Sequence, residues 1–146
     1  MKKFVLLLTV IGMFSLQSAS ADDVVTRDIE RLPQAAKNFI QKHFPNEKVS
    51  YMKIDKELLS TTYEVTFISG IELEFTKDGE WKEIDCKHTA VPAGAVPTKI
   101  SEYVKTNFPG TFIKQIEKKK RRYEVELSNK LDLEFDMNEN FIKIDD

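Results

Sequence analysis

The sequence LPQAAKNFIQKHFPN at residues 32–46 recurs, with substitutions, as VPTKISEYVKTNFPG at residues 96–110. Both segments start with an apolar residue and proline, continue as an amphipathic stretch and end in Phe-Pro and a turn residue. Farther along, Tyr-Glu-Val at 63–65 recurs at 123–125, and Leu-Glu-Phe at 73–75 recurs at 133–135. Ordered matches of this kind indicate that the chain contains two copies of one structural unit. The spacings make the second copy shorter, with the loss between Pro109 and Tyr123.

Each copy is predicted to open with a helix. Pro33 and Pro97 suit the first helical position, where a missing N–H costs nothing. Apolar residues then recur at helical spacing. Pro45 and Pro109 end the helices, because proline disfavours helical geometry in the residue before it.

Turn chemistry predicts the register of the strands that follow. A three-residue loop with Gly70 in the left-handed conformation places Phe67 opposite Ile71. Asp78-Gly79 is typical of a two-residue hairpin and would place Leu73 opposite Ile84, leaving Lys82 opposite Phe75. Residues 47–55 and 111–118 supply a first strand in each copy, whose phase the pattern leaves open.

The predicted fold is therefore α+β, with two tandem repeats, each one helix packed on a four-stranded antiparallel sheet. The repeats are expected at residues 22–90 and 91–146, and the second face of each sheet is left open. One such unit alone is small for a stable core, which favours finding two together.

The N-terminus predicts export. Lys2 and Lys3 precede an apolar run from Phe4 to Leu16 and the small residues Ser18-Ala19-Ser20-Ala21. This is the pattern of a secretory signal peptide, expected at residues 1–21. The run is short for a membrane span and no second one follows, so no membrane insertion is expected after cleavage. The predicted location is periplasmic or secreted.

The net charge of the mature chain limits the classes of partner that it can bind. Without Lys2 and Lys3 the formal net charge falls from −2 to −4. An acidic protein is a poor candidate for binding nucleic acid or an anionic membrane. The local run Lys118–Arg122 is interpreted as a solvated hairpin tip.

No catalytic, metal or cofactor site emerges from the sequence. Cys86 and His88 lie two apart on a strand, where their side chains diverge too far for a nucleophile pair. Nothing supplies the four converging ligands of structural zinc. Cys86, the single cysteine, can form no internal disulfide and is predicted to point inward. We therefore expect a non-enzymatic protein.

Acidic side chains are predicted to face each other on the open face. The register sets Glu64 opposite Glu74, and Glu74 opposite Glu83. Like charges across a strand pair are destabilising, so their accumulation suggests a cationic partner. The alternative is that bases such as Lys53 and Lys114 neutralise them; calcium fits less well, since it needs six or more converging oxygens. Trp81 and Phe141 are predicted to stand on the same face. The candidate partner-binding residues are Trp81, Phe141, Glu64, Glu72, Glu74, Glu83, Glu124 and Glu134.

The motif of apolar-Pro, helix, Phe-Pro, Tyr-Glu-Val and Leu-Glu-Phe strands and an Asp-Gly-x-Trp hairpin resembles the exported PepSY-like proteins, also described as beta-lactamase-inhibitor-protein-like. The resemblance covers residues 30–146 in both copies. It implies tandem helix-and-sheet repeats whose open faces form a concave binding surface, in a periplasmic or secreted protein. Some members of the wider group inhibit hydrolases or peptidases, but no inhibitory loop can be matched residue by residue.

The sequence thus predicts an exported non-enzymatic binding module, protein-binding or inhibitory, whose partner is an exported protein such as a hydrolase or peptidase. The alternative is a periplasmic small-ligand or ion-binding protein that uses the cleft between the units.

Overall fold

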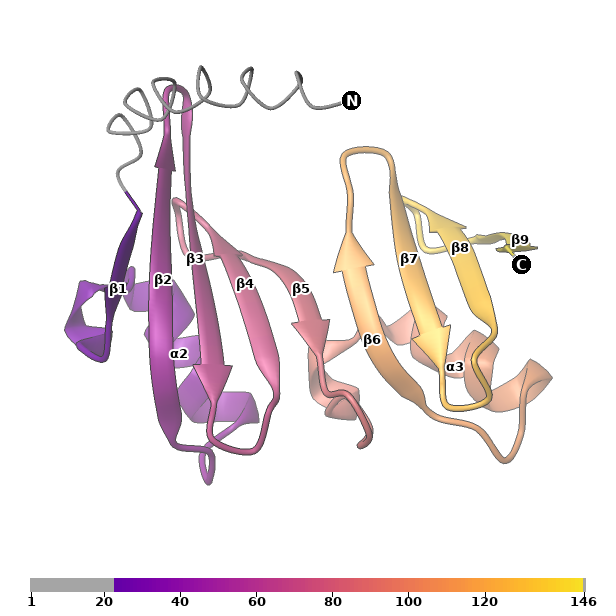
Figure 1. The fold of residues 1–146 in the computed structure, drawn as a ribbon. Coiled ribbons are helices and arrows are strands. Elements are labelled where there is room, and N and C mark those ends of the chain that lie inside the picture. The colour runs from indigo at the N-terminus through magenta and orange to yellow at the C-terminus, as the bar shows by residue number, and fades with distance from the viewer. Residues whose placement is uncertain (1–22, 146) are drawn as a thin grey trace, which may run out of the picture.

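The computed structural model describes residues 23–145, so the predicted signal peptide at residues 1–21 lies outside the described part. In this range nine strands form one antiparallel sheet in which spatial order follows chain order, and two α-helices accompany it (Figure 1). The strands are β1 (Val24–Thr26), β2 (Val49–Glu57), β3 (Ser60–Phe67), β4 (Glu72–Thr76), β5 (Trp81–Asp85), β6 (Ile113–Lys118), β7 (Arg122–Leu127), β8 (Asp132–Asp136) and β9 (Phe141–Asp145). The α-helices are α2 (Gln34–His43) and α3 (Thr98–Asn107), and short 3-10 helices lie at η2 (Ile29–Arg31) and η3 (Ala93–Ala95).

The prediction of a separate four-stranded sheet in each repeat is wrong, because β5 and β6 pair and make the sheet continuous. Ile84 lies opposite Ile116, and the Cys86 N–H donates to the Lys114 carbonyl at 2.9 Å. A sheet edge carries unpaired backbone groups, and joining two edges satisfies them. The strand β1, which sequence reasoning missed, covers the other side of β2. We call β1 to β5 with α2 unit one, and β6 to β9 with α3 unit two.

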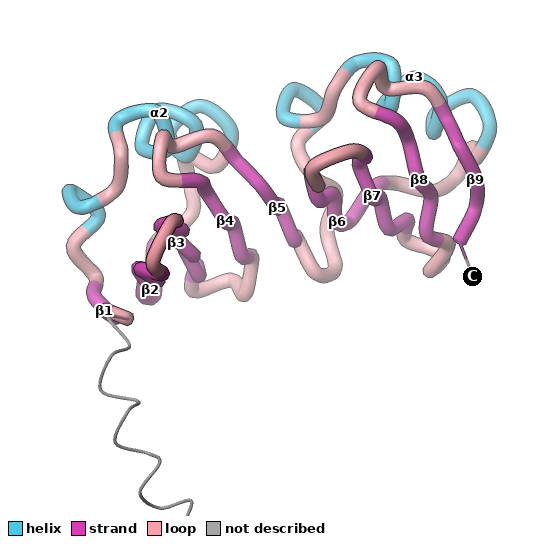
Figure 2. Tube along the Cα trace, turned by 90° about the horizontal axis from the view of Figure 1, so that it is seen from above, coloured by secondary structure: helices cyan, strands magenta, loops and turns pink. Residues whose placement is uncertain are grey.

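Both helices lie on the same face of the sheet (Figure 2). They start after Pro33 and Pro97, and their C-caps are Phe44 and Phe108, each directly before a proline. Their apolar residues pack onto the buried face of the sheet, and Ile100 is completely buried. Within residues 23–145 the other face carries no helix, and we call it the open face.

Much of the predicted register is confirmed. Val65 lies opposite Leu73 and Tyr63 opposite Phe75, while the Phe67 N–H donates to the Ile71 carbonyl at 2.9 Å. The side chains of Val65, Leu73 and Phe75 are at most 1% exposed, so this alternation supplies the core.

The first strand of each unit contains a β-bulge. In β2 the pairs Val49–Phe67 and Tyr51–Thr66 leave one extra residue between them, and in β6 the pairs Ile113–Leu127 and Gln115–Glu126 do the same. An extra residue shifts the period-two pattern by one position. This is why the phase of these strands could not be read from the alternation of apolar residues.

The predicted two-residue hairpin at Asp78-Gly79 is wrong. The Thr76 N–H donates to the Glu80 carbonyl, and Trp81, not Lys82, lies opposite Phe75. Lys82 is the extra residue of a bulge, which restores Leu73 opposite Ile84. Unit two repeats the pattern, with Phe141 opposite Phe135.

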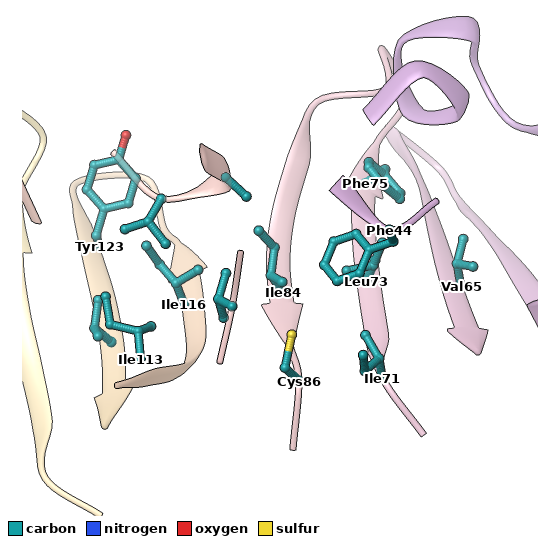
Figure 3. Packing of buried hydrophobic residues seen from close by; sticks show 14 of the residues in the cluster. Phe44, Val65, Ile71, Leu73, Phe75, Ile84, Cys86, Ile113, Ile116 and Tyr123 are labelled. Atoms are coloured by element: carbon teal, nitrogen blue, oxygen red, sulfur yellow. The ribbon is translucent and has the colours of Figure 1, made fainter. Parts of the chain in front are cut away.

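Cys86 is buried, as predicted. Its side chain is 2% exposed and lies with those of Ile71 and Ile84 on the helix-covered side of the sheet (Figure 3). Burial, followed by the nearby Asp85 carboxylate, raises the pKa of the thiol to about 11. The group therefore stays protonated and unreactive at neutral pH.

Candidate binding face

A row of glutamates crosses the open face from one unit into the other. Each residue lies directly opposite the next on the neighbouring strand, from β3 to β8, and we call it the glutamate row: Glu64, Glu74, Glu83, Glu117, Glu124 and Glu134. Lys53 lies opposite the first member and Lys143 opposite the last. The row is continuous because β5 and β6 join, which places Glu83 opposite Glu117.

A second row runs beside it, displaced by two residues along each strand. It begins with Tyr51 and Thr66 and then becomes acidic, through Glu72, Asp85, Gln115, Glu126, Asp132 and Asp145. The two rows together make the open face predominantly acidic over both units.

Two hollows lie between the rows, one in each unit. The hollow in unit one has a volume of about 110 Å³ and is lined by residues that include Tyr51, Lys53, Glu64, Glu72, Glu74 and Glu83. The hollow in unit two has a volume of about 240 Å³ and is lined by residues that include Gln115, Glu117, Glu124, Glu126, Asp132 and Asp145. Both are shallow depressions of the same surface.

Basic residues neutralise part of the face. In unit one Lys82 contacts Glu74 at 3.0 Å, and Lys87 contacts Glu72 and Asp85 at 2.9 Å each. In unit two Lys114 contacts Glu126 at 3.2 Å. Of the two bases expected to act this way, Lys114 therefore does, whereas Lys53 contacts Asp23 at 3.3 Å and has no ion pair within the row.

Glu83 is the least favourably placed member of the glutamate row. Its carboxylate accepts a hydrogen bond from Gln115 Nε2 and makes no ion pair within residues 23–145. Burial raises its pKa, and Glu117, Glu74 and Asp85 raise it further against the opposing effect of Gln115. The ionised form of Glu83 is thus destabilised by neighbouring negative charges at the place where β5 pairs with β6.

Glu124 is in the opposite situation. Arg122 Nε donates to it at 2.7 Å and Lys119 contacts it at 3.0 Å. Burial acts to raise its pKa, but these two partners lower it overall. Asp132 is again unfavourable, because burial and the neighbouring Glu126 and Asp145 raise its pKa.

The six acidic residues predicted for the site all lie on the open face, with the predicted neighbours: Glu64, Glu72, Glu74, Glu83, Glu124 and Glu134. Sequence reasoning missed Glu117 and Gln115, which bridge the two units. The sequence feature that could have revealed them is the spacing of Ile113 and Ile116, which are both buried. Two residues three positions apart in a strand can share one face only if a bulge lies between them.

The placement of Trp81 and Phe141 on the open face is wrong. The bulge turns Trp81 to the helix face, where its ring centroid lies 6.4 Å from that of Tyr123. Lys118 Nζ lies over the Trp81 ring, 5.9 Å from its centroid. Phe141 stacks on Tyr103 of α3, with ring centroids 4.6 Å apart. Both rings pack against the core, so they hold the fold together.

In the described range 23–145, no three His, Cys, Asp or Glu side chains are arranged to hold a metal ion. Within that range, no helix has both the length and the apolar character needed to span a membrane.

These features define a class of protein: an antiparallel sheet of two similar units, covered by helices on one face and acidic on the other. A family model described as "Putative beta-lactamase-inhibitor-like, PepSY-like" matches the chain twice, at residues 22–65 and 61–143. The chain belongs to this PepSY-like family. A comparison with curated proteins gives no match.

Solved structures from Bacteroides are similar to the chain over most of its length. One, from Bacteroides thetaiotaomicron, is described as a "putative calcium-regulated periplasmic protein"; it has 43% identity and a TM-score of 0.81, over 86% of this chain and 98% of that one. Another, from Bacteroides vulgatus, is described as a "putative periplasmic protein of unknown function"; it has 47% identity and a TM-score of 0.80, over 85% and 99% of the two chains. The predicted periplasmic or secreted location is confirmed by these relatives.

Proposed function

We propose that this chain is an exported, non-enzymatic module that binds a basic surface of another protein through the glutamate row. The observation that carries the proposal is the continuity of the row across both units. Each pair of like charges directly opposite across a ladder costs a few tenths to about 1 kcal/mol. Lysine or arginine side chains of a partner, placed over the row, would remove that cost and gain charge-assisted hydrogen bonds.

The shape of the face favours a protein over a small molecule. Small-molecule pockets typically enclose about 300–1,000 Å³ and bury most of the ligand. The two hollows, at about 110 and 240 Å³, fall below that range. A surface of shallow depressions spread over many strands suits an extended contact instead. An exported hydrolase or peptidase is the kind of partner that the inhibitor-like description of the family suggests.

An ion-binding role is the second candidate. It is favoured by one relative, which is described as calcium-regulated, and by the mutual repulsion of Asp132, Glu126 and Asp145 in the hollow of unit two. Calcium takes six to eight oxygen ligands, which this hollow would have to gather by moving side chains or by recruiting water.

The test begins with capture of partners from a periplasmic extract by the mature chain. Glu117→Lys reverses a charge at the centre of the row, and Glu102→Lys makes the same change on the exposed surface of α3 as a matched control. We expect Glu117→Lys to slow association with the captured partner, with the defect fading as salt is added. Its melting temperature should stay equal or rise, since Glu117 lies between Glu83 and Glu124.

Trp81→Ala separates binding from folding, because Trp81 packs on the helix face. It should lower the melting temperature and leave the association rate unchanged. Equal effects of the Glu117 and Glu102 reversals on association would contradict a role for the row. Capture that requires calcium, together with calcium uptake by the isolated chain, would favour the ion-binding candidate.

A further inference from the structure

The strands β5 and β9 occupy equivalent places in the two units but have different surroundings. Ile84 in β5 is fully buried against Ile116 of β6. Its counterpart in β9, Ile144, is 44% exposed, although it lies opposite the buried Leu133. Within residues 23–145, β9 pairs with β8 alone and forms one edge of the sheet. The contact that buries Ile84 has no equivalent at Ile144 within this range.

The backbone of β9 has hydrogen-bonding groups at the open edge that can pair with a further strand. The Leu127 N–H donates to the Leu131 carbonyl, so Leu131 and, by alternation along β8, Leu133 direct their backbone groups toward β7. Ile144 lies opposite Leu133, and its N–H and C=O therefore point away from β8, to the open edge. A strand added at this edge would receive its hydrogen bonds from Ile144.

We propose that β9 pairs with β9 of a second copy of this chain, antiparallel and centred on Ile144. The charges of the strand select this register. Centring on Lys143 would oppose two lysines, and centring on Asp145 would oppose two aspartates. Centring on Ile144 instead places Lys143 of each copy opposite Asp145 of the other, and like-charge pairs are avoided. The two copies of Ile144 meet at the two-fold axis, as Ile84 and Ile116 meet inside the chain.

The symmetry of this pairing also sets its limits. Contact between β9 strands is isologous and closes at two copies, whereas contact between β9 and β1 of another copy would be heterologous and would continue into filaments. The strand has five residues, so the contact is smaller than a standard interface and the dimer should depend on protein concentration.

Cysteine crosslinking tests the register in the mature chain. In the proposed dimer the two Ile144 Cα atoms are about 5.5 Å apart, within the range of a disulfide. Under mild oxidation Ile144→Cys should give a covalent dimer. Ile142→Cys is the matched control, because two such residues would be roughly 13 Å apart in this register. The native Cys86 is buried and should not contribute.

The second test exchanges the charged residues of β9 and measures dimerisation by analytical ultracentrifugation. Lys143→Asp and Asp145→Lys should each raise the dissociation constant of the dimer about tenfold, since each change places like charges at two symmetric positions. The double variant should restore wild-type dimerisation. A chain that stays monomeric at high concentration, equal crosslinking at 142 and 144, or growth into filaments would overturn the proposal. None of these outcomes depends on the partner proposed for the open face.

Discussion

The two units share a sequence motif, but their closing strands have unequal energetic roles. In unit one β5 is an interior strand, and Ile84 is 0% exposed. In unit two β9 is an edge strand, and Ile144 is 44% exposed. A repeated motif therefore specifies the path of the chain, while the neighbouring strand decides how much each repeated residue contributes to stability.

The turns before these strands also differ. Gly79 in unit one has φ +88°, and a Cβ at this position would lie 2.9 Å from both the Ala35 Cβ and the Ala36 nitrogen of α2. The equivalent residue in unit two is Glu139, also at positive φ, whose carboxylate accepts from the Lys99 N–H at 3.1 Å. Unit one packs its turn closely against the helix, and unit two uses a side chain from the turn to cap the helix.

The largest expected difference between the units is at the two equivalent isoleucines. Ile84→Ala should lower the free energy of unfolding by about 2–5 kcal/mol, because it leaves a cavity in a closed core. Ile144→Ala should cost under about 1 kcal/mol, because solvent and neighbouring side chains can fill the space. Chemical denaturation at low protein concentration measures both. Equal losses would mean that β9 is covered in solution as fully as β5.

A smaller difference is expected at the turns. Gly79→Ala should destabilise the fold by about 2–4 kcal/mol, since it combines an unfavourable positive φ with a clash against the backbone of α2. Glu139→Ala should cost about 0.5–1 kcal/mol, the value of a lost helix cap. Thermal melts of the two variants test the comparison. A mild effect at Gly79 would show that the turn can withdraw from the helix.

The smallest effects on folding stability are expected for substitutions in the glutamate row, where Glu83→Gln and Glu124→Gln should change stability in opposite directions. The folded-state pKa of Glu83 is raised, so its ionisation costs stability once the pH exceeds the unfolded-state value. Glu83→Gln should thus stabilise the chain at pH 7 by a few tenths to about 1 kcal/mol, and the gain should vanish below about pH 4.

The matched variant is Glu124→Gln. The folded-state pKa of Glu124 is lowered, so its carboxylate contributes stability above the unfolded value, and that stability is lost as the pH falls through the folded value. This variant should be less stable than the wild type at pH 7, with the difference closing in acid. Stability curves between pH 3 and pH 7 check both signs. The same sign for both would contradict the assigned partners.

Sequence reasoning predicted the helices and the order of the acidic residues because these follow from local patterns. Pro33 and Pro97 mark helix starts, and the alternation in β3 and β4 sets Glu64 opposite Glu74. The bulges in β5 and β9 could not be placed in this way, because a bulge displaces the pattern without a characteristic residue type. The errors at Trp81 and Phe141 come from this cause.

The continuous sheet was missed for a different reason. Pairing between β5 and β6 joins segments separated by α3, and neither strand carries a turn that fixes the other. The choice between two sheets and one depends on how many edges are left unpaired in the whole molecule. This pairing places Glu83 opposite Glu117 and thereby joins the acidic residues of the two units into one row.

The pairing between β5 and β6, called the seam here, also provides a site at which partner binding can be measured from the backbone. Only three residue pairs define its register, against eight between β2 and β3. Ladders with few pairs open more readily, and amide hydrogen exchange measures such opening. The Cys86 amide, bonded to the Lys114 carbonyl at 2.9 Å, lies at one end of the seam. A partner that spans Glu83 and Glu117 would clamp the two halves together, and the exchange of this single amide should slow when it does.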